Sequence, residues 1–297
     1  MKPTTLPLLA SCAFLFVSCG KKQAANVAPE TKEESIVLAQ RHFLPAAGTI
    51  ATKNNTMTML DAAMTVKAGP QELPGKMTRT EAGKETLEIL AAHKVRRLLV
   101  SKSTSGKMTI NGTDQPVPEK PDPLAGKPVI VEQVGGKWSA TLEDGGTPSP
   151  AQQGRLTRMA KEAERDSDFE MYGDTPRKVG DKWSVDPGKL MSFGDAEALS
   201  GDYKVELVEL KDVAGVRCAV LKAVFDFKGK TEAEGDDPQM DIRFVGDVVA
   251  TRSIVDMIDL DVEMNATVTL AGTPAPQVSM HVEGPMRMTE KVSLKKP

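Results

Sequence analysis

The sequence predicts a mainly β protein of the α+β class, with antiparallel sheets in a meander or half-barrel and one clear helix. The strongest observation is residues 258–270, where seven apolar side chains alternate with polar ones, as in a strand with one buried and one solvated face. The second is a helical stripe of apolar residues at about 150–165. The third is a series of shorter alternating runs separated by Gly and Asn turns.

The composition is ordinary for a globular protein of 297 residues. Apolar residues make up 40% and charged residues 27%, so we do not expect wholesale disorder. Lys and Arg number 38 against 41 Asp and Glu, and the resulting net charge of −3 argues against a nucleic-acid partner. Aromatic residues are scarce, with Phe 8, Trp 2 and Tyr 2, which weakens the case for an aromatic-lined pocket.

The N-terminus has the pattern of an export signal. Lys2 supplies a positive charge, and residues 6–17 form an apolar stretch of 12 residues, shorter than the roughly 20 that a membrane-spanning helix needs. The stretch ends in Val17-Ser18-Cys19-Gly20, which resembles the lipobox of bacterial lipoproteins, where small residues precede an invariant cysteine. The resemblance implies that Cys19 is lipidated by a diacylglycerol thioether, with fatty acids such as palmitate, and becomes the first residue of the mature chain.

Two alternatives to this interpretation stay open. The tetrapeptide Leu9-Ala10-Ser11-Cys12 matches the lipobox better, but only residues 6–8 would then remain as its apolar core. An ordinary signal peptide with an incidental cysteine is the other alternative, and Phe16 stands where the lipobox usually has leucine.

Cysteine usage agrees with export. Once Cys12 is removed and Cys19 is acylated, Cys218 is alone, so neither an intramolecular disulfide nor a cysteine zinc site is possible. We expect Cys218 to be a buried free thiol in a strand.

Five segments are expected along the chain. Residues 1–18 are the lipoprotein signal peptide and 19–35 a flexible tether. An N-terminal β-rich half (36–146), a helix with its linker (147–175) and a C-terminal antiparallel β half (176–297) follow.

Local signals place the elements of the N-terminal half. Residues 31–34 have the spacing of a capping box before an apolar run at 36–38, which predicts a short helix that Pro45 stops. Asn54-Asn55 is typical of a hairpin turn. The apolar alternation then changes parity, which indicates a β-bulge near Leu60.

Residues 85–100 fit both a helix and a hairpin turning at His93-Lys94, and the surrounding strands favour the hairpin. Asn111-Gly112 is a strong turn signal after a strand. Residues 128–134 and 138–142 predict a second hairpin through two glycines.

The helix at about 150–165 has clear start signals. Ser149 is a good N-cap residue, and Pro150 suits the first helical position. Its apolar stripe, expected to pack on a sheet, consists of Leu156, Met159, Ala160 and Ala163.

The C-terminal half is expected to be an antiparallel meander. We expect strands near 203–207, 217–227, 240–245, 258–270, 278–282 and 286–288, with a charged loop at 228–238. Lys-Trp-Ser occurs twice after a glycine turn, around Trp138 and Trp183, a similarity too short to establish an internal repeat.

Catalytic and cofactor motifs are missing from the sequence. It has no Gly-x-Ser-x-Gly, no phosphate-binding loop and no Gly-x-Gly-x-x-Gly, and its three histidines show no metal-ligand spacing. We therefore expect no cofactor.

One group of carboxylates is the only candidate metal site. Asp259, Asp261 and Glu263 are expected on the same face of one strand, where they could help to bind Ca²⁺. A solvated strand face that prevents edge pairing is the favoured interpretation, because calcium needs six to eight converging oxygens.

The chain contains 15 methionines. Core filling by a soft side chain is the simpler interpretation, and an adaptable apolar cavity for acyl chains or a variable partner is the other. Six of them lie in or beside the C-terminal strands: Met240, Met257, Met264, Met280, Met286 and Met288.

Taken together, the signal segment and the turn Val179-Gly180-Asp181-Lys182-Trp183 resemble uncharacterised bacterial envelope lipoproteins with a β-rich domain. The resemblance carries no activity and no catalytic residues. It implies a membrane-anchored envelope protein, and Gly20 after the lipidated cysteine favours the periplasmic face of the outer membrane over the inner membrane.

Three functions are compatible with these observations. The first is non-enzymatic binding of an apolar ligand or an envelope protein. The second is an envelope hydrolase that uses carboxylates, and the third is a purely structural envelope component. The missing motifs favour the first and third.

We predict lipidation at Cys19. Acyl chains contribute about 0.8 kcal/mol per buried CH₂, so three of them hold a protein on a membrane essentially permanently. Mass spectrometry of the mature protein should find a triacylated N-terminal Cys19, and Cys19→Ala should be released or left unprocessed. A mature N-terminus at any other residue would contradict the prediction.

Overall fold

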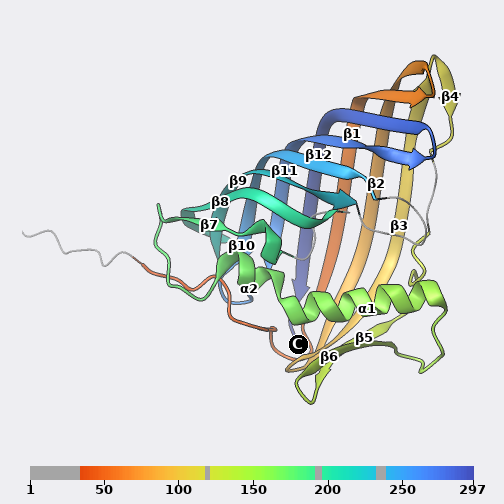
Figure 1. The fold of residues 1–297 in the computed structure, drawn as a ribbon. Helices are drawn as coiled ribbons and strands as arrows, with labels where there is room; N and C mark the ends of the chain where they lie inside the picture. Colours follow the sequence, from red (N-terminus) through yellow and green to blue (C-terminus); the bar gives the residue numbers. More distant parts are fainter. Residues whose placement is uncertain (1–33, 118–120, 191–195, 232–238) are drawn as a thin grey trace, which may run out of the picture. The chain divides into compact units, whose positions relative to one another are not determined.

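The computed structural model describes residues 34–117, 121–190, 196–231 and 239–297, and Figure 1 shows their fold. The signal segment, Cys19 and nearly all of the expected tether lie outside the described residues. The strands are β1 (Ile50–Ala68), β2 (Gln71–Ala91), β3 (Lys94–Ile110), β4 (Thr113–Gln115), β5 (Val129–Val134), β6 (Lys137–Leu142), β7 (Lys182–Val185), β8 (Ala196–Val213), β9 (Val216–Thr231), β10 (Asp241–Ser253), β11 (Asp259–Ala275) and β12 (Val278–Lys295). The helices are α1 (Pro150–Arg165), α2 (Ser167–Tyr172) and the 3₁₀ turn η1 (Pro187–Lys189).

All described strands belong to one antiparallel sheet, which confirms the predicted mainly β class. The order across the sheet is β6-β5-β3-β2-β1-β12-β11-β10-β9-β8-β7, with β4 paired to β3. Strands that follow one another in the chain are neighbours, except where β4 leads to β5, since both pair with β3, and where β6 leads to β7. The sheet is therefore an open meander whose two outer strands are joined by the segment that carries α1 and α2 (Figure 1).

Pairing of β1 with β12 joins the N-terminal and C-terminal β-rich regions. The register runs from Ile50 opposite Lys295 to Ala68 opposite Val278. Residues 36–146 and 176–297 thus share one sheet within a single compact unit, Glu34–Pro297. The two Lys-Trp-Ser segments lie on β6 and β7, the outer strands at opposite ends of this sheet.

Three of the predicted hairpin turns in the N-terminal half are present. Strands β2 and β3 turn at Ala92-His93, one residue before the predicted His93-Lys94, and His93 adopts a φ of 61°. Asn111 and Gly112 both have positive φ between β3 and β4, as a type I′ turn requires. The two-glycine turn joins β5 and β6. The helical alternative for residues 85–100 is thereby excluded.

Two local expectations are wrong. Asn54-Asn55 is not a turn, because both residues pair with β2 and with β12, and this two-sided ladder outweighs their turn preference. Residues 36–38 are not helical, since Ile36 forms an isolated bridge with Arg177 and Leu38 is buried against the sheet. The short helix α2 was not expected.

Helix α1 begins and ends as predicted. The Ser149 hydroxyl accepts a hydrogen bond from the Gln152 backbone, and the Gln152 side chain accepts one from the Ser149 backbone, forming a capping box. Leu156 and Met159 are buried against residues of β5 and β6. Helix α1 thereby covers the end of the sheet that β5 and β6 form.

The bulge in β1 is confirmed. Its register against both neighbours shifts after Met59, and Asp61 has a φ of 47°. Odd-numbered residues such as Met57 therefore face the same side as even-numbered residues such as Met64 beyond the bulge. We call this side of the sheet, which packs against α2, the inner face.

The long strand predicted at 258–270 is β11, which begins at Asp259, and its even-numbered residues from Val262 onward face inward as expected. Met264, Ala266 and Val268 are buried, whereas Glu263 and Thr267 are exposed. A second bulge at Leu260 shifts the register, because Arg252 pairs with Asp259 while Thr251 pairs with Asp261.

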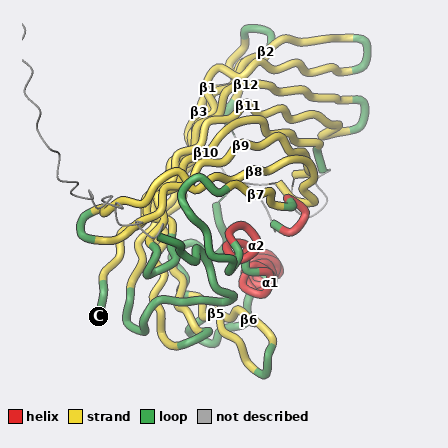
Figure 2. The backbone as a smooth tube through the Cα atoms, turned by 90° about the vertical axis from the view of Figure 1, so that its left-hand side faces the viewer, coloured by secondary structure: helices red, strands yellow, loops and turns green. Residues whose placement is uncertain are grey.

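Glycines allow close contacts between strands of the bent sheet (Figure 2). A Cβ on Gly284 would lie 2.5 Å from the Cα of Ala62, and one on Gly246 would lie 2.1 Å from the Asn265 carbonyl oxygen. Any side chain at these two positions would push neighbouring strands apart.

We predict opposite sensitivities for adjacent residues of β11. Met264 is 1% exposed, so Met264→Asp would place an unpaired charge against the core and should cost about 3 to 5 kcal/mol. Glu263 is 54% exposed, so Glu263→Lys should cost about 0.5 kcal/mol. Urea unfolding measures both, and equal losses would show that the faces are misassigned.

Candidate apolar ligand site

The floor of the candidate site is a row of apolar side chains that crosses six neighbouring strands. Cross-strand pairing places Met57 beside Met288, and Met288 beside Met264. The row then continues through Val248, Ala223 and Val205 on β10, β9 and β8. Five of these residues lie on the consecutive strands β8 to β12, and Met57 joins them only because β1 pairs with β12.

A cavity of about 490 Å³ opens above this row, within the 300–1,000 Å³ typical of ligand pockets. All six residues of the row line it, together with Tyr203 and Phe244. Seven methionines contribute to the wall: Met57, Met59, Met77, Met171, Met264, Met286 and Met288. Because methionine is unbranched and polarisable, such a wall can adapt to apolar ligands of varied shape.

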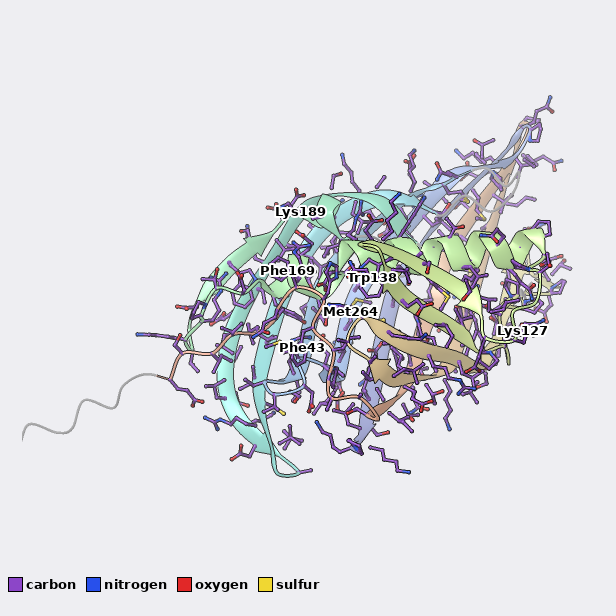
Figure 3. All side chains as sticks on the ribbon, turned by 90° about the horizontal axis from the view of Figure 1, so that it is seen from below. Phe43, Lys127, Trp138, Phe169, Lys189 and Met264 are labelled. Carbon is purple, nitrogen blue, oxygen red and sulfur yellow. The ribbon has the colours of Figure 1, made fainter. Side chains whose placement is uncertain are left out.

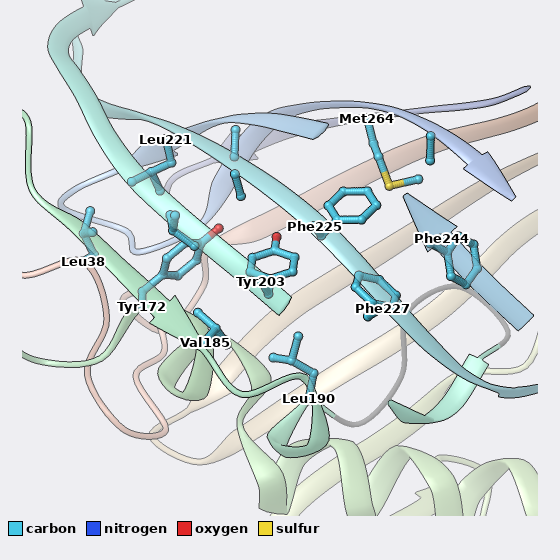
Figure 4. Packing of buried hydrophobic residues seen from close by; sticks show 14 of the residues in the cluster. Leu38, Tyr172, Val185, Leu190, Tyr203, Leu221, Phe225, Phe227, Phe244 and Met264 are labelled. Carbon is cyan, nitrogen blue, oxygen red and sulfur yellow. The ribbon is translucent and has the colours of Figure 1, made fainter. Parts of the chain in front are cut away.

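An aromatic group closes one flank of the site (Figure 4). The rings of Tyr203 and Phe225 stack with centroids 5.9 Å apart. Phe227 lies 5.1 Å from Phe225 and 5.5 Å from Phe244. These four residues come from adjacent strands β8, β9 and β10. Tyr203 and Phe244 line the cavity, and Phe225 and Phe227 connect their rings within the core.

Arg252 is a buried cation beside the cavity. Its side chain is 1% exposed and donates hydrogen bonds to the Leu38 carbonyl at 2.8 Å, Asp259 at 2.9 Å and Asp168 at 3.0 Å. Burial lowers the pKa of Arg252, but the carboxylates of Asp168 and Asp259 outweigh burial, so the net pKa is raised. Arg252 therefore stays charged and ties residue 38 and α2 to the sheet.

Tyr172, the last residue of α2, completes this group. The Arg252 guanidinium lies 4.3 Å from its ring centroid, and its hydroxyl donates to Asp259 at 3.0 Å. Burial and the negative charge of Asp259 raise the pKa of Tyr172 well above its ordinary value. Tyr172, Met171 and Asp168 thus form the part of the cavity wall that the helix contributes.

Two ion pairs lie at the edge of the cavity. Lys53 contacts Glu290 at 2.8 Å, and Arg79 pairs with Glu81 on the same strand. All four residues line the cavity. Their side chains are between 14% and 40% exposed, which places them where the cavity meets solvent.

The structure separates the three carboxylates considered as a metal site. The bulge at Leu260 turns Asp259 to the inner face, so the expectation that all three share one face is wrong. Asp261 and Glu263 lie on the outer face, opposite Lys291 and Arg287 at 3.8 and 3.6 Å. Among the described residues, no group of three or more His, Cys, Asp or Glu is arranged to hold a metal ion.

Of the methionines singled out in the sequence, some line the cavity and others fill the core. Met264, Met286 and Met288 line the cavity, whereas Met240 is buried beside Gly272.

Cys218 is buried and free, as expected, and burial raises the pKa of its thiol.

Sequence reasoning missed Arg252, Tyr172 and Arg79. No local pattern marks these three residues. Arg252 and Tyr172 gain partners from elements far away in the chain, and the surroundings of Arg79 depend on how β2 pairs with β1.

A second cavity of about 310 Å³ lies beside α1 and β6. Phe43 and Trp138 line it, and Figure 3 shows both from below. The Trp138 ring lies 5.5 Å from that of His42, and its indole Nε1 is buried with no hydrogen-bond partner among the residues described. Charged side chains of both signs, including Arg97 and Glu162, line this space, so it is less apolar than the first cavity.

We predict that Tyr172→Phe destabilises the fold and alters its pH dependence. The loss of one hydrogen bond should cost about 1 kcal/mol near neutral pH. Because the pKa of Tyr172 is raised in the fold, its contribution is complete below pH 10 and is lost as the pH rises further. The variant should therefore lose stability less steeply than the wild type above about pH 10.

Urea unfolding at several pH values measures this difference. The control is a double variant, Tyr172→Phe with Tyr203→Phe, which removes both tyrosines of the chain. Parallel stability curves for the wild type and the single variant would contradict the prediction.

Within the described part of the chain, no helix is long and apolar enough to cross a membrane.

No family model matches the sequence, and no curated protein matches it. Among solved structures, one described as lipid-protein interactions in lipovitellin is similar, with 8% identity and a TM-score of 0.41. The match covers 84% of this chain and 26% of that chain, so this protein spans about a quarter of the lipovitellin chain. Values this low assign neither a family nor a function.

Proposed function

We propose that this protein binds an apolar, chain-shaped ligand in the methionine-lined cavity and acts without covalent chemistry. The observation that carries the proposal is the cavity of about 490 Å³ on the inner face. Protein cores are close-packed and leave few voids larger than a water molecule. A cavity of this size, lined by adaptable methionines, is therefore better explained by a ligand than by imperfect packing.

The shape and polarity of the cavity favour an elongated ligand. Its lining residues extend from Arg79 on β2 to Tyr203 on β8, six strand spacings or about 29 Å along the sheet. The six residues of the row are apolar, and the charged residues that line the cavity lie outside the row, on β1, β2, β11, β12 and α2. An acyl chain would match this distribution.

We further propose that the protein works at a membrane through lipidated Cys19, with the periplasmic face of the outer membrane as its location. Support comes from the lipobox-like segment of the sequence. Residues 20–33 span at most about 50 Å when fully extended. A tether of this length would keep the cavity close to the acyl chains of the same membrane, which raises their effective concentration.

The other two functions have less support. For a hydrolase, Asp168 and Asp259 are two carboxylates that line the cavity near one another, but both are bound by Arg252. The other two, Glu81 and Glu290, are paired with Arg79 and Lys53. Their pairing with Arg252 accounts for Asp168 and Asp259, because it anchors α2 to the sheet. A purely structural component gives no reason for a cavity of this size, and a binding measurement separates it from the proposed function.

We predict that Ala223→Phe blocks ligand binding. Ala223 lies in the middle of the apolar row, so a phenyl ring there would occupy the cavity. Adjacent Val224 points to the outer face and is 49% exposed, so Val224→Phe adds the same group outside the cavity. Fluorescence of N-phenyl-1-naphthylamine, displaced by methyl decanoate, should report binding by wild type and Val224→Phe.

The expected result for Ala223→Phe is at least a tenfold weaker affinity with an unchanged circular dichroism spectrum. Equal binding by both variants would place the ligand elsewhere. Absence of binding to the wild-type protein would refute the proposed function.

A further inference from the structure

Arg79 carries an unused hydrogen-bond donor at the rim of the cavity. It lies on β2 opposite Met59 of β1, and both residues line the cavity. The Arg79 side chain is 40% exposed, yet its Nε is buried and has no hydrogen-bond partner among the described residues. A buried donor without a partner costs about 1 to 3 kcal/mol, so an arriving acceptor would be bound favourably.

One other guanidinium nitrogen of Arg79 is already paired. Its Nη2 contacts the Glu81 carboxylate, and Glu81 is only 14% exposed. The Nε is thus the buried donor that a ligand atom would satisfy.

The rim around Arg79 is electrically balanced. Arg79 supplies one positive charge and its partner Glu81 supplies one negative charge, which gives 1 − 1 = 0. A ligand carboxylate would add an unbalanced charge to this partly buried group and would compete with Glu81 for the guanidinium. An uncharged carbonyl oxygen would satisfy the donor without either penalty.

We infer that the ligand is an uncharged acyl ester, an inference that rests on the proposed function. Its carbonyl oxygen accepts a hydrogen bond from Arg79 Nε, and its acyl chain follows the apolar row across Met57, Met288 and Met264. Arg79 then acts as the specificity residue at the rim, while the methionines supply the affinity for the chain.

The test compares three ligands with matched chains: methyl decanoate, an alkane of similar length, and decanoate. Each displaces N-phenyl-1-naphthylamine from the full-length protein at pH 7. We expect the ester to bind about tenfold more tightly than the alkane, the value of one hydrogen bond to a charged donor, and more tightly than decanoate.

Two double variants, each of which leaves the net charge unchanged, show which ion pair causes the preference for the ester. Arg79→Met with Glu81→Met removes the donor and its paired carboxylate, and should bind ester and alkane equally. Lys53→Met with Glu290→Met removes the other ion pair that lines the cavity and should retain the tenfold preference. Thermal unfolding confirms that each variant is folded before binding is compared.

The outcomes separate this inference from the proposed function. Equal wild-type affinity for ester and alkane would overturn the inference and leave the cavity as an apolar site. Tighter binding of decanoate than of the ester would overturn the choice of an uncharged ligand. Loss of the preference in the Lys53 and Glu290 variant would overturn the assignment to Arg79. No binding of any ligand would refute the proposed function itself.

Discussion

The pairing of β1 with β12 is the constraint on which the rest of the structure depends. Every other neighbouring pair of strands in the sheet joins segments that are close in the chain, whereas this pair joins residues more than 200 positions apart, such as Ile50 and Lys295. Without it, two shorter sheets would each expose an edge rich in unpaired backbone groups. With it, Met57 of the first region meets Met288 and Met264 of the second, and the floor of the cavity forms.

Arg252 performs a comparable task for the elements outside the sheet. A buried guanidinium must have partners, because an unpaired charge in the interior is costly. Leu38, Asp168 and Asp259 supply them from three separate segments. The requirement to satisfy one cation thereby positions α2 and the residues around Leu38 against the inner face, and Tyr172 and Met171 become part of the cavity wall. The contacts that satisfy this buried charge therefore also set the geometry of the proposed binding site.

Much of the fold could be predicted because its signals are local. Ser149 and Pro150 mark the start of α1, Asn111-Gly112 marks a tight turn, and the parity change at Leu60 marks a bulge. Predictions failed where tertiary contacts compete with local preference. Asn54-Asn55 has turn chemistry but lies in the middle of a strand, because β2 and β12 pair with it from both sides. The bulge at Leu260 has no local signal, and it separated Asp259 from Asp261 and Glu263.

The sequence by itself determined the antiparallel β class, the position of α1 and the inward face of β11, since alternation and capping depend on neighbouring residues. It also supplied the unusual number of methionines. Only the tertiary structure decided which of them surround a cavity, because burial on the inner face depends on which strands pair. The buried Nε of Arg79 and the charge balance around it were likewise decided by tertiary structure. A hydrogen-bond partner or its absence follows from the positions of groups that the sequence places far apart.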